Sequence, residues 1–242
     1  MSALITSQKM PSVTTVSGNV ITLIIRPIVA LLTALLLGSP TTVAGKELSL
    51  TNFPSPGRLD YKIDRNGSEV GSLSIEFIRN DDQLTVRTHA MVVVTFWGIP
   101  LYRFAYESEE QWISGRLVSL TSRSNDDGEP RLVDFKVDGD RLHGTYNGKV
   151  RDYPSTLIPA SLWNPETLHQ TVLLDPIRGR DRQVTVVDKG EDAIKIKGKA
   201  GTAHHYAITD KTTREIWYDS NGELVQVQYF TKDGSLIQIM LR

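Results

Sequence analysis

Apolar and polar residues alternate with a period of two along most of the chain after residue 57. In the segment LSIEFIR, the residues Leu73, Ile75 and Phe77 fall on one face of an extended chain, and Ser74 and Glu76 fall on the other. The same alternation recurs in LTVRTHAMV (84–92), YRFAYES (102–108), ELVQVQYF (223–230) and LIQIML (236–241). This pattern is typical of strands that have one packed face and one solvated face.

Glycine follows asparagine or aspartate at short intervals between these segments. The pairs stand at 66–67, 127–128, 138–139, 147–148, 221–222 and 233–234. Such pairs tolerate the positive φ angles of a two-residue hairpin loop, so they predict successive hairpins. No predicted strand leads into a long amphipathic helix and then another apolar strand, which argues against a parallel sheet. We therefore expect a mainly β fold: an antiparallel meander of about a dozen strands, strongly curved or forming an incomplete barrel.

One segment breaks the alternation, IPASLWNPETLHQ at 158–170. Asn164 is a favourable N-cap, Pro165 suits the first helical position, and Glu166 suits the first turn because of the helix dipole. These residues predict one short helix over 165–174, with Leu168 facing the sheet.

The predicted helix separates a first group of hairpins, 58–153, from a second, 182–242. No linker composition appears between them, so we expect one continuous sheet and a single domain over 58–242, with the helix laid against it. Residues 45–57 form a polar lead-in that contains two prolines.

The first 44 residues differ in character from the rest. They contain no acidic residue and no histidine, and Arg26 precedes an apolar stretch over 28–37. A base, an apolar core and small residues up to Ala44 are typical of a secretory signal cleaved near Ala44, which predicts a periplasmic protein. The alternative is an uncleaved membrane anchor over Val20–Gly38, although Arg26 interrupts it.

Charge and cysteine content exclude several classes of function. The whole chain has a formal net charge of −1, and loss of residues 1–44 removes two bases and leaves about −3. No basic field is therefore available for nucleic acid. The chain has no cysteine, which excludes disulfides, thiolate metal sites, a cysteine nucleophile and a lipid-modified N-terminal cysteine.

Metal-binding patterns are weak. Glu166 and His169 are three residues apart on the predicted helix, but Glu-x-x-His sites occur in pairs with further glutamates, and here the pattern occurs once. His204 and His205 are consecutive in a predicted strand, so their side chains point to opposite faces. We assign no metal ligand and no cofactor.

Catalytic motifs are also missing. The sequence contains no Gly-x-Ser-x-Gly, Ser-x-x-Lys or His-Glu-x-x-His pattern. We expect the carboxylates of the predicted strands to lie on the solvated face of the sheet, among them Glu107, Glu109, Glu110 and Asp134. A hydrolase would need some of them to cluster with His89, His143 or His205, so an enzyme is the less favoured interpretation and we assign no catalytic residue.

Aromatic side chains carry the most suggestive pattern. A curved sheet covered by one short helix can leave part of its concave face unfilled, and an apolar concave face is the usual form of a lipid cavity. The candidate ligand-binding residues are Trp97, Tyr102, Phe104, Tyr106, Trp163 and Leu168.

Three sequence segments, taken in order, resemble a family of exported bacterial proteins that is classed as a domain of unknown function. They are WGIPLYRFAYESEEQWISGRLVSLTSRSNDDGEPRLVDF (97–135), the Pro159-x-Ser161-x-Trp163-Asn164 segment, and HHYAITDKTTREIWYDSNGELVQVQYFTKDGSLIQIMLR (204–242). The resemblance spans most of 59–242 and implies an exported, mostly β domain without an established activity. A more distant likeness in architecture is to periplasmic lipoprotein carriers, whose curved antiparallel sheet holds acyl chains.

Together these observations favour a non-enzymatic periplasmic protein that binds a lipid or another apolar ligand on the concave face. The alternative is an envelope structural or protein-interaction module with a filled core. In either case a membrane contact is expected only through the N-terminal segment.

Overall fold

The computed structural model describes residues 57–242, so the predicted signal segment and nearly all of the lead-in lie outside the described residues. Fifteen strands and one short helix follow one another along the chain. The strands are β1 (Arg58–Arg65), β2 (Ser68–Asn80), β3 (Gln83–Phe96), β4 (Ile99–Ile113), β5 (Arg116–Asp126), β6 (Glu129–Asp138), β7 (Arg141–Tyr146), β8 (Lys149–Pro154), β9 (Val172–Asp175), β10 (Arg180–Gln183), β11 (Thr185–Ile196), β12 (Lys199–Thr209), β13 (Thr213–Tyr218), β14 (Leu224–Phe230) and β15 (Leu236–Leu241).

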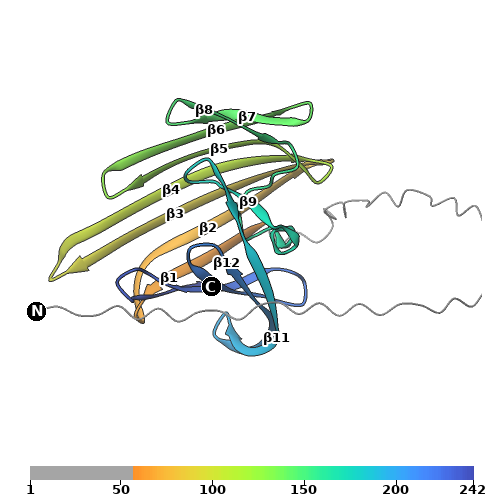
Figure 1. Cartoon of the computed structure of the whole chain (residues 1–242). Helices are drawn as coiled ribbons and strands as arrows, with labels where there is room; N and C mark the ends of the chain where they lie inside the picture. The colour runs from red at the N-terminus through yellow and green to blue at the C-terminus, as the bar shows by residue number, and fades with distance from the viewer. Residues whose placement is uncertain (1–56) are drawn as a thin grey trace, which may run out of the picture. The chain divides into compact units, whose positions relative to one another are not determined.

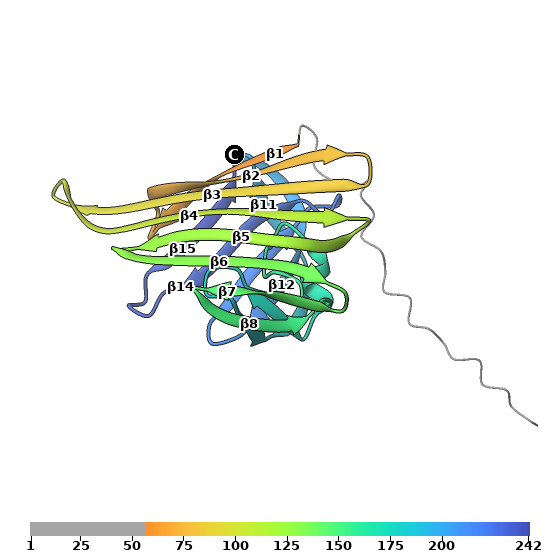
Figure 2. The same cartoon turned by 90° about the horizontal axis from the view of Figure 1, so that it is seen from above.

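Thirteen of these strands form one antiparallel sheet in the order β11-β12-β13-β14-β15-β1-β2-β3-β4-β5-β6-β7-β8. The last strand, β15, pairs with β1, with Ile63 opposite Ile239, and this pairing joins the two predicted groups of hairpins. The sheet is strongly bent (Figure 1), so that β11 to β15 lie behind β1 to β8 when it is seen from above (Figure 2). The strands β8 and β11 remain as edges, so the sheet is strongly curved but not closed into a barrel.

Tight turns connect the strands as predicted. At 66–67, 127–128 and 147–148 both residues of the Asn-Gly or Asp-Gly pair have positive φ. The glycines of the remaining predicted pairs, Gly139, Gly222 and Gly234, have positive φ as well. Each turn thus reverses the chain directly between neighbouring strands of the sheet.

The predicted helix over 165–174 is wrong in its extent. Only Pro165–His169 form a 3-10 helix, η2, and the following residues form strand β9, which pairs with β10. The predicted N-cap is confirmed, because the Asn164 side chain accepts a hydrogen bond from the Glu166 amide at 3.0 Å. The helix ends early because Leu174 exchanges backbone hydrogen bonds with the 158–160 segment, which require an extended chain.

The concave face of the sheet holds the core. Leu84, Val86 and Trp112 of the first hairpins and Ile216 and Val227 of the last are buried together. η2 is too short to cross a membrane, and no other helix occurs in residues 57–242.

Candidate ligand-binding site

The chain between the two edge strands, residues 155–184, runs through the concave side of the sheet, and we call it the crossing segment (Figure 1). Its main anchor is Trp163, whose ring makes edge-to-face contacts with Phe77 at 5.5 Å and Trp112 at 5.7 Å between centroids. Such aromatic pairs add to the effect of burial. Trp163 is therefore a core side chain that fixes the crossing segment to the sheet.

Hydrogen bonds tie the crossing segment to both walls of the interior. On one wall, Tyr218 of β13 donates to the Leu162 carbonyl at 2.7 Å. On the other, the Ser122 hydroxyl of β5 donates to the Pro176 carbonyl. These hydrogen bonds satisfy backbone carbonyls that no strand pairing satisfies, so the segment keeps a fixed path across the interior.

A carboxylate lies under this segment. Glu110 of β4 is 1% exposed and accepts hydrogen bonds from the Trp112 indole at 3.0 Å and from the Ser161 hydroxyl. Burial raises the pKa of Glu110 to about 7, although hydrogen bonds from Ser161, Trp112 and Trp163 act in the opposite direction. The expectation that Glu110 belongs to the solvated face is wrong, because its side chain shares the inward face of β4 with Tyr106 and Trp112.

An apolar cavity of about 200 Å³ adjoins the crossing segment. Leu73 and Tyr106 form part of its wall on the first hairpins, Val227 and Ile239 form part of its wall on the last strands, and Trp163 contributes from the crossing segment. A cavity bounded in this way by apolar and aromatic side chains is suited to a hydrocarbon chain.

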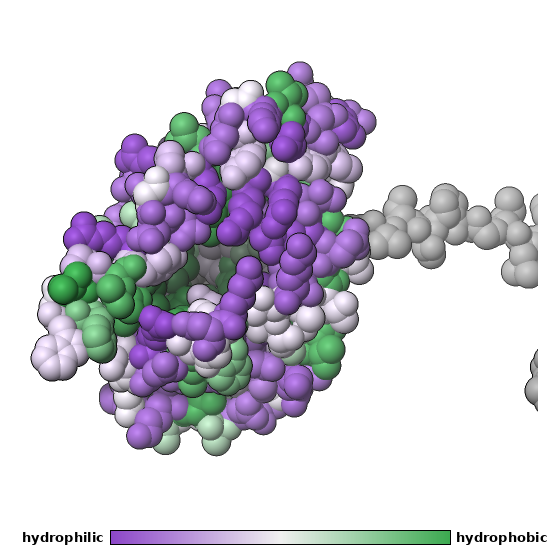
Figure 3. All heavy atoms as spheres, turned by 60° about the vertical axis from the view of Figure 1, so that its left-hand side comes forward, coloured by the Kyte–Doolittle hydropathy of each residue, from purple (hydrophilic) through white to green (hydrophobic). Residues whose placement is uncertain are grey.

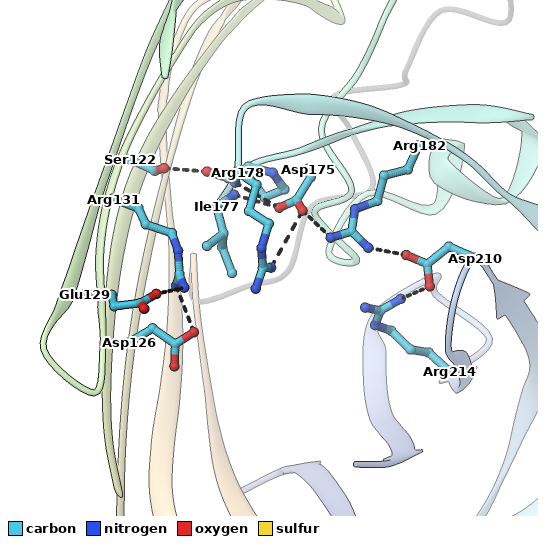
Figure 4. Close-up of polar contacts among 11 residues, drawn as sticks. Ser122, Asp126, Glu129, Arg131, Asp175, Ile177, Arg178, Arg182, Asp210 and Arg214 are labelled. Carbon is cyan, nitrogen blue, oxygen red and sulfur yellow. Dashed lines mark hydrogen bonds and ion pairs between the residues drawn. The ribbon is translucent and has the colours of Figure 1, made fainter. Parts of the chain in front are cut away.

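A second cavity of about 210 Å³ lies between the crossing segment and strands β12 and β13. Arg178, Arg182 and Arg214 line it, together with Asp175 and Asp210 (Figure 4). Ala160, Leu162, Pro176 and Ile177 line both this cavity and the apolar one, so the two cavities adjoin.

The arginines of the second cavity are held unequally. Arg182 forms ion pairs with both Asp175 and Asp210, whose carboxylates are nearly buried. Arg178 reaches Asp175 only at 3.8 Å, and Arg214 reaches Asp210 at 3.4 Å. Arg182 is therefore the fixed centre of the network, whereas Arg178 and Arg214 keep guanidinium N–H donors that can bind a ligand.

A further polar group lies near Arg178 in Figure 4, outside the lining of either cavity. Asp126 at the end of β5 accepts hydrogen bonds from Tyr102 at 2.7 Å and from Arg131 at 2.8 Å. Burial acts to raise the pKa of Asp126, but these two hydrogen bonds and the charge of Arg131 outweigh it and lower the pKa. Asp126 is thus a fixed negative charge at neutral pH.

The structure brings together some of the predicted ligand-binding residues. Tyr106 and Trp163 line the apolar cavity. Tyr102 and Phe104 lie on the same face of β4 but nearer its start, outside the lining of that cavity. Leu168 packs against the core, and Trp97 lies far along the β3–β4 hairpin at its turn, away from the other candidates (Figure 1).

The histidines do not gather in one cleft. His89, His143 and His205 lie on β3, β7 and β12, and each has its own carboxylate neighbours, such as Asp152 for His143 at 2.7 Å. His169 is exposed. Within residues 57–242, no three metal-ligating side chains are grouped so that they could hold an ion.

Sequence reasoning missed the arginines and Glu110. The run DPIRGRDR, 175–182, contains a turn-forming Asp-Pro and three arginines, but only the fold brings Arg214 to them. Asp175 forms the turn itself, because its side chain accepts hydrogen bonds from the amides of Ile177 and Arg178 at 2.9 and 3.1 Å.

The geometry defines a class: an open, strongly curved antiparallel sheet whose concave side is spanned by its own connecting segment. A crystal structure described as a beta-barrel-like protein of domain of unknown function DUF1849, from Brucella abortus, has a similar fold. It is 15% identical in sequence, with a TM-score of 0.55 over 76% of this chain and 94% of that chain. No curated protein matches the sequence.

Residues 61–242 match the family described as domain of unknown function DUF6134, and the chain belongs to this family. Membership confirms the predicted resemblance to a domain of unknown function, and export remains a prediction. The likeness to the Brucella protein concerns the fold alone, because the sequence identity is low.

Proposed function

We propose that the chain binds an amphipathic ligand of the lipid class, with its hydrocarbon part in the apolar cavity and an anionic headgroup at the arginines. The observation that carries this proposal is the adjacency of the two cavities, which share four lining residues. Each is smaller than an ordinary ligand site, but jointly they fall in the usual range of about 300 to 1,000 Å³.

Arg178 and Arg214 are the headgroup ligands in this proposal. Each guanidinium carries five N–H donors, and each makes a single long contact with a carboxylate. Arginine donors in fork geometry suit carboxylate and phosphate oxygens. A fatty acid or a phospholipid would therefore place its charge there.

We also propose that the protein acts in the periplasm after export. The support is the layout of the first 44 residues, with a base, an apolar stretch and small residues before Ala44. The mass of the protein recovered from a periplasmic extract tests this, because cleavage near Ala44 removes a defined segment, whereas an uncleaved anchor retains it.

A fluorescent long-chain fatty acid tests the binding proposal. Ala160→Phe places a ring where the two cavities adjoin and should reduce affinity at least about tenfold, the effect of losing about 1.4 kcal/mol of binding. The matched control is Ala193→Phe, at an exposed position of edge strand β11, which should bind as the parent does.

The headgroup assignment has its own test. Arg178→Gln should weaken binding of the acid by about tenfold, because a hydrogen bond to a charged group contributes about 1.5 to 3 kcal/mol. It should leave binding of the uncharged alcohol of the same chain length unchanged. Arg180→Gln is the control, since Arg180 is exposed on β10 and lies outside both cavities.

A second candidate function has an observation in its favour. Trp163 and Leu174 of the crossing segment belong to one buried core with both groups of strands, as expected of an envelope interaction module that binds no small ligand. If neither the acid nor the alcohol binds the parent protein, and native mass spectrometry finds no lipid carried through purification, the interaction module is favoured.

A further inference from the structure

We propose that the turn between β3 and β4 inserts into the surface of a lipid bilayer. This turn, the β3–β4 tip, consists of residues 96–101, with the sequence FWGIPL. Its four large apolar side chains are exposed: Phe96 by 63%, Trp97 by 88%, Ile99 by 64% and Leu101 by 62%. The proposal does not depend on the ligand proposed above.

The tip projects from the body of the protein. The β3–β4 hairpin extends beyond its neighbours in the sheet (Figures 1 and 2). A space-filling view shows an apolar group at this projection beside a hollow in the molecular surface (Figure 3). A projecting tip suits a flat bilayer, whereas a protein partner would need a groove to receive it.

The turn residue itself is unusual. Trp97 and Gly98 have φ angles of 52° and 78°, the positive values of a two-residue hairpin turn. Within residues 57–242, three other turns of this kind use Asn-Gly or Asp-Gly, the residues that tolerate such angles best, and two use Ser-Gly and Lys-Gly, so none of these five places an aromatic residue there. A bulky side chain is disfavoured there, so the tryptophan is explained by what its exposed ring does rather than by the turn.

Charge along the hairpin also matches a bilayer. No charged residue or histidine occurs from Ala90 to Tyr102, and Arg103 follows directly. Arg103 follows Ile99 by four residues along β4, about 13 Å in an extended strand, and a β-bulge at Leu101 lies between them. Within residues 57–242 the Arg103 guanidinium forms no ion pair, because the Asp127 carboxylate is bound by the Arg103 backbone amide at 3.3 Å, so the guanidinium is available to a lipid phosphate.

This order of side chains follows the layers of a membrane surface. The apolar tip, with Trp97 at the turn and Ile99 and Leu101 behind it, enters the boundary of the acyl region, and Arg103 still further back lies among the headgroups, where a cation is favoured. Because apolar burial drives the contact, a bilayer without net charge should suffice.

Tryptophan fluorescence provides a specific test in the full chain. The sequence has four tryptophans, and Trp112, Trp163 and Trp217 are buried with at most 7% exposure. Trp97 is therefore the residue that phosphatidylcholine vesicles with brominated acyl chains can quench. Residues 1–56 contain no tryptophan, so vesicle binding through the apolar N-terminal stretch would give no such quenching.

The expected result is a blue shift and quenching of the exposed tryptophan on addition of brominated vesicles. Trp97→Phe should remove the quenching while the protein still floats with the vesicles. The double variant Ile99→Asn, Leu101→Asn should abolish the quenching, whereas Val150→Asn, which changes an apolar residue 76% exposed on β8, should leave it intact.

Two results would overturn the proposal. One is the absence of Trp97 quenching in the parent chain, whether or not the chain floats with the vesicles. The other is a blue shift that appears without vesicles and grows with protein concentration, which would show that the tip contacts a second copy of the chain. Failure of fatty-acid binding would not affect either readout.

Discussion

Replacement of Glu110 by glutamine probes the buried carboxyl under the crossing segment. The glutamine amide has nearly the same shape, keeps an acceptor for the Trp112 indole and can donate to the Ser161 hydroxyl. It therefore imitates the neutral form of the glutamate at every pH.

The magnitude follows from the difference between the folded and unfolded chain. Burial raises the pKa of Glu110 from its ordinary 4.5 to about 7 in the folded protein. Below pH 4.5 the side chain is neutral in both states, and its contribution to stability is fully present. As the pH rises from 4.5 through 7, the unfolded chain loses the proton first, so this contribution is lost. The whole change corresponds to about 3 kcal/mol, since each tenfold change in proton affinity is worth 1.36 kcal/mol.

Urea unfolding of the parent and of Glu110→Gln measures the effect. Between about pH 5 and about pH 8 the free energy of unfolding of the parent should fall by about 2 to 3 kcal/mol relative to the variant. Comparison of the two proteins cancels the pH dependence of stability that they share. Glu109→Gln is the matched control, because Glu109 is the next residue on β4 but faces outward and pairs with Arg87. A difference between parent and Glu110→Gln that stays constant across this range would refute the reasoning.

Three further changes test the architecture by equilibrium unfolding. Trp163→Ala should lower the free energy of unfolding by about 3 to 5 kcal/mol, because it removes the buried ring that holds the crossing segment to the sheet. His169→Ala, at an exposed position, should change stability by less than about 0.5 kcal/mol. Equal effects from the two changes would contradict the role of Trp163 as the anchor. Asp175→Asn should destabilise by about 1.5 to 3 kcal/mol, since it removes one of the two carboxylates bound to the partly buried Arg182. An unchanged midpoint would show that the network is dispensable. Gly144→Ala should destabilise strongly because its new methyl group would overlap the backbone of the neighbouring strand, while Gly201→Ala, which meets only a flexible side chain at 3.2 Å, should be tolerated; similar losses from both would refute the steric argument.

The sequence predicted the sheet because its signals are local. Alternation and the Asn-Gly and Asp-Gly pairs each depend on a few neighbouring residues, and these placed the hairpins correctly. The turns at Trp97–Gly98, Ser114–Gly115 and Lys197–Gly198 use residues with weaker turn preference. Trp97 was assigned to the ligand-binding face because of its aromatic ring. The failed prediction is the extent of the helix, since the extended state of Leu174 depends on hydrogen bonds with a partner 16 residues earlier, Ile158.

The site was less predictable because it depends on contacts between distant residues. Tyr106 and Trp163 were identified by their aromatic character alone. Arg178 was missed, since its position beside Arg214 is set by the path of the crossing segment. Glu110 was misplaced although a local signal existed: counting by twos from Tyr106 puts it on the inward face.

The inward-facing residues of the first hairpins are small or polar where the crossing segment passes over them. Along β4 the inward residues are Tyr106, Ser108, Glu110 and Trp112, so two small or polar positions interrupt the aromatic ones. Ser108 stands opposite Ser122, whose hydroxyl binds the crossing segment. The small Ser108 gives the segment room to approach, the Ser122 hydroxyl satisfies the Pro176 carbonyl, and Glu110 accepts a hydrogen bond from the Ser161 hydroxyl. A row of large apolar residues there would fill the space that the crossing segment needs, so the polar inward positions specify its path and, with it, the walls of both cavities.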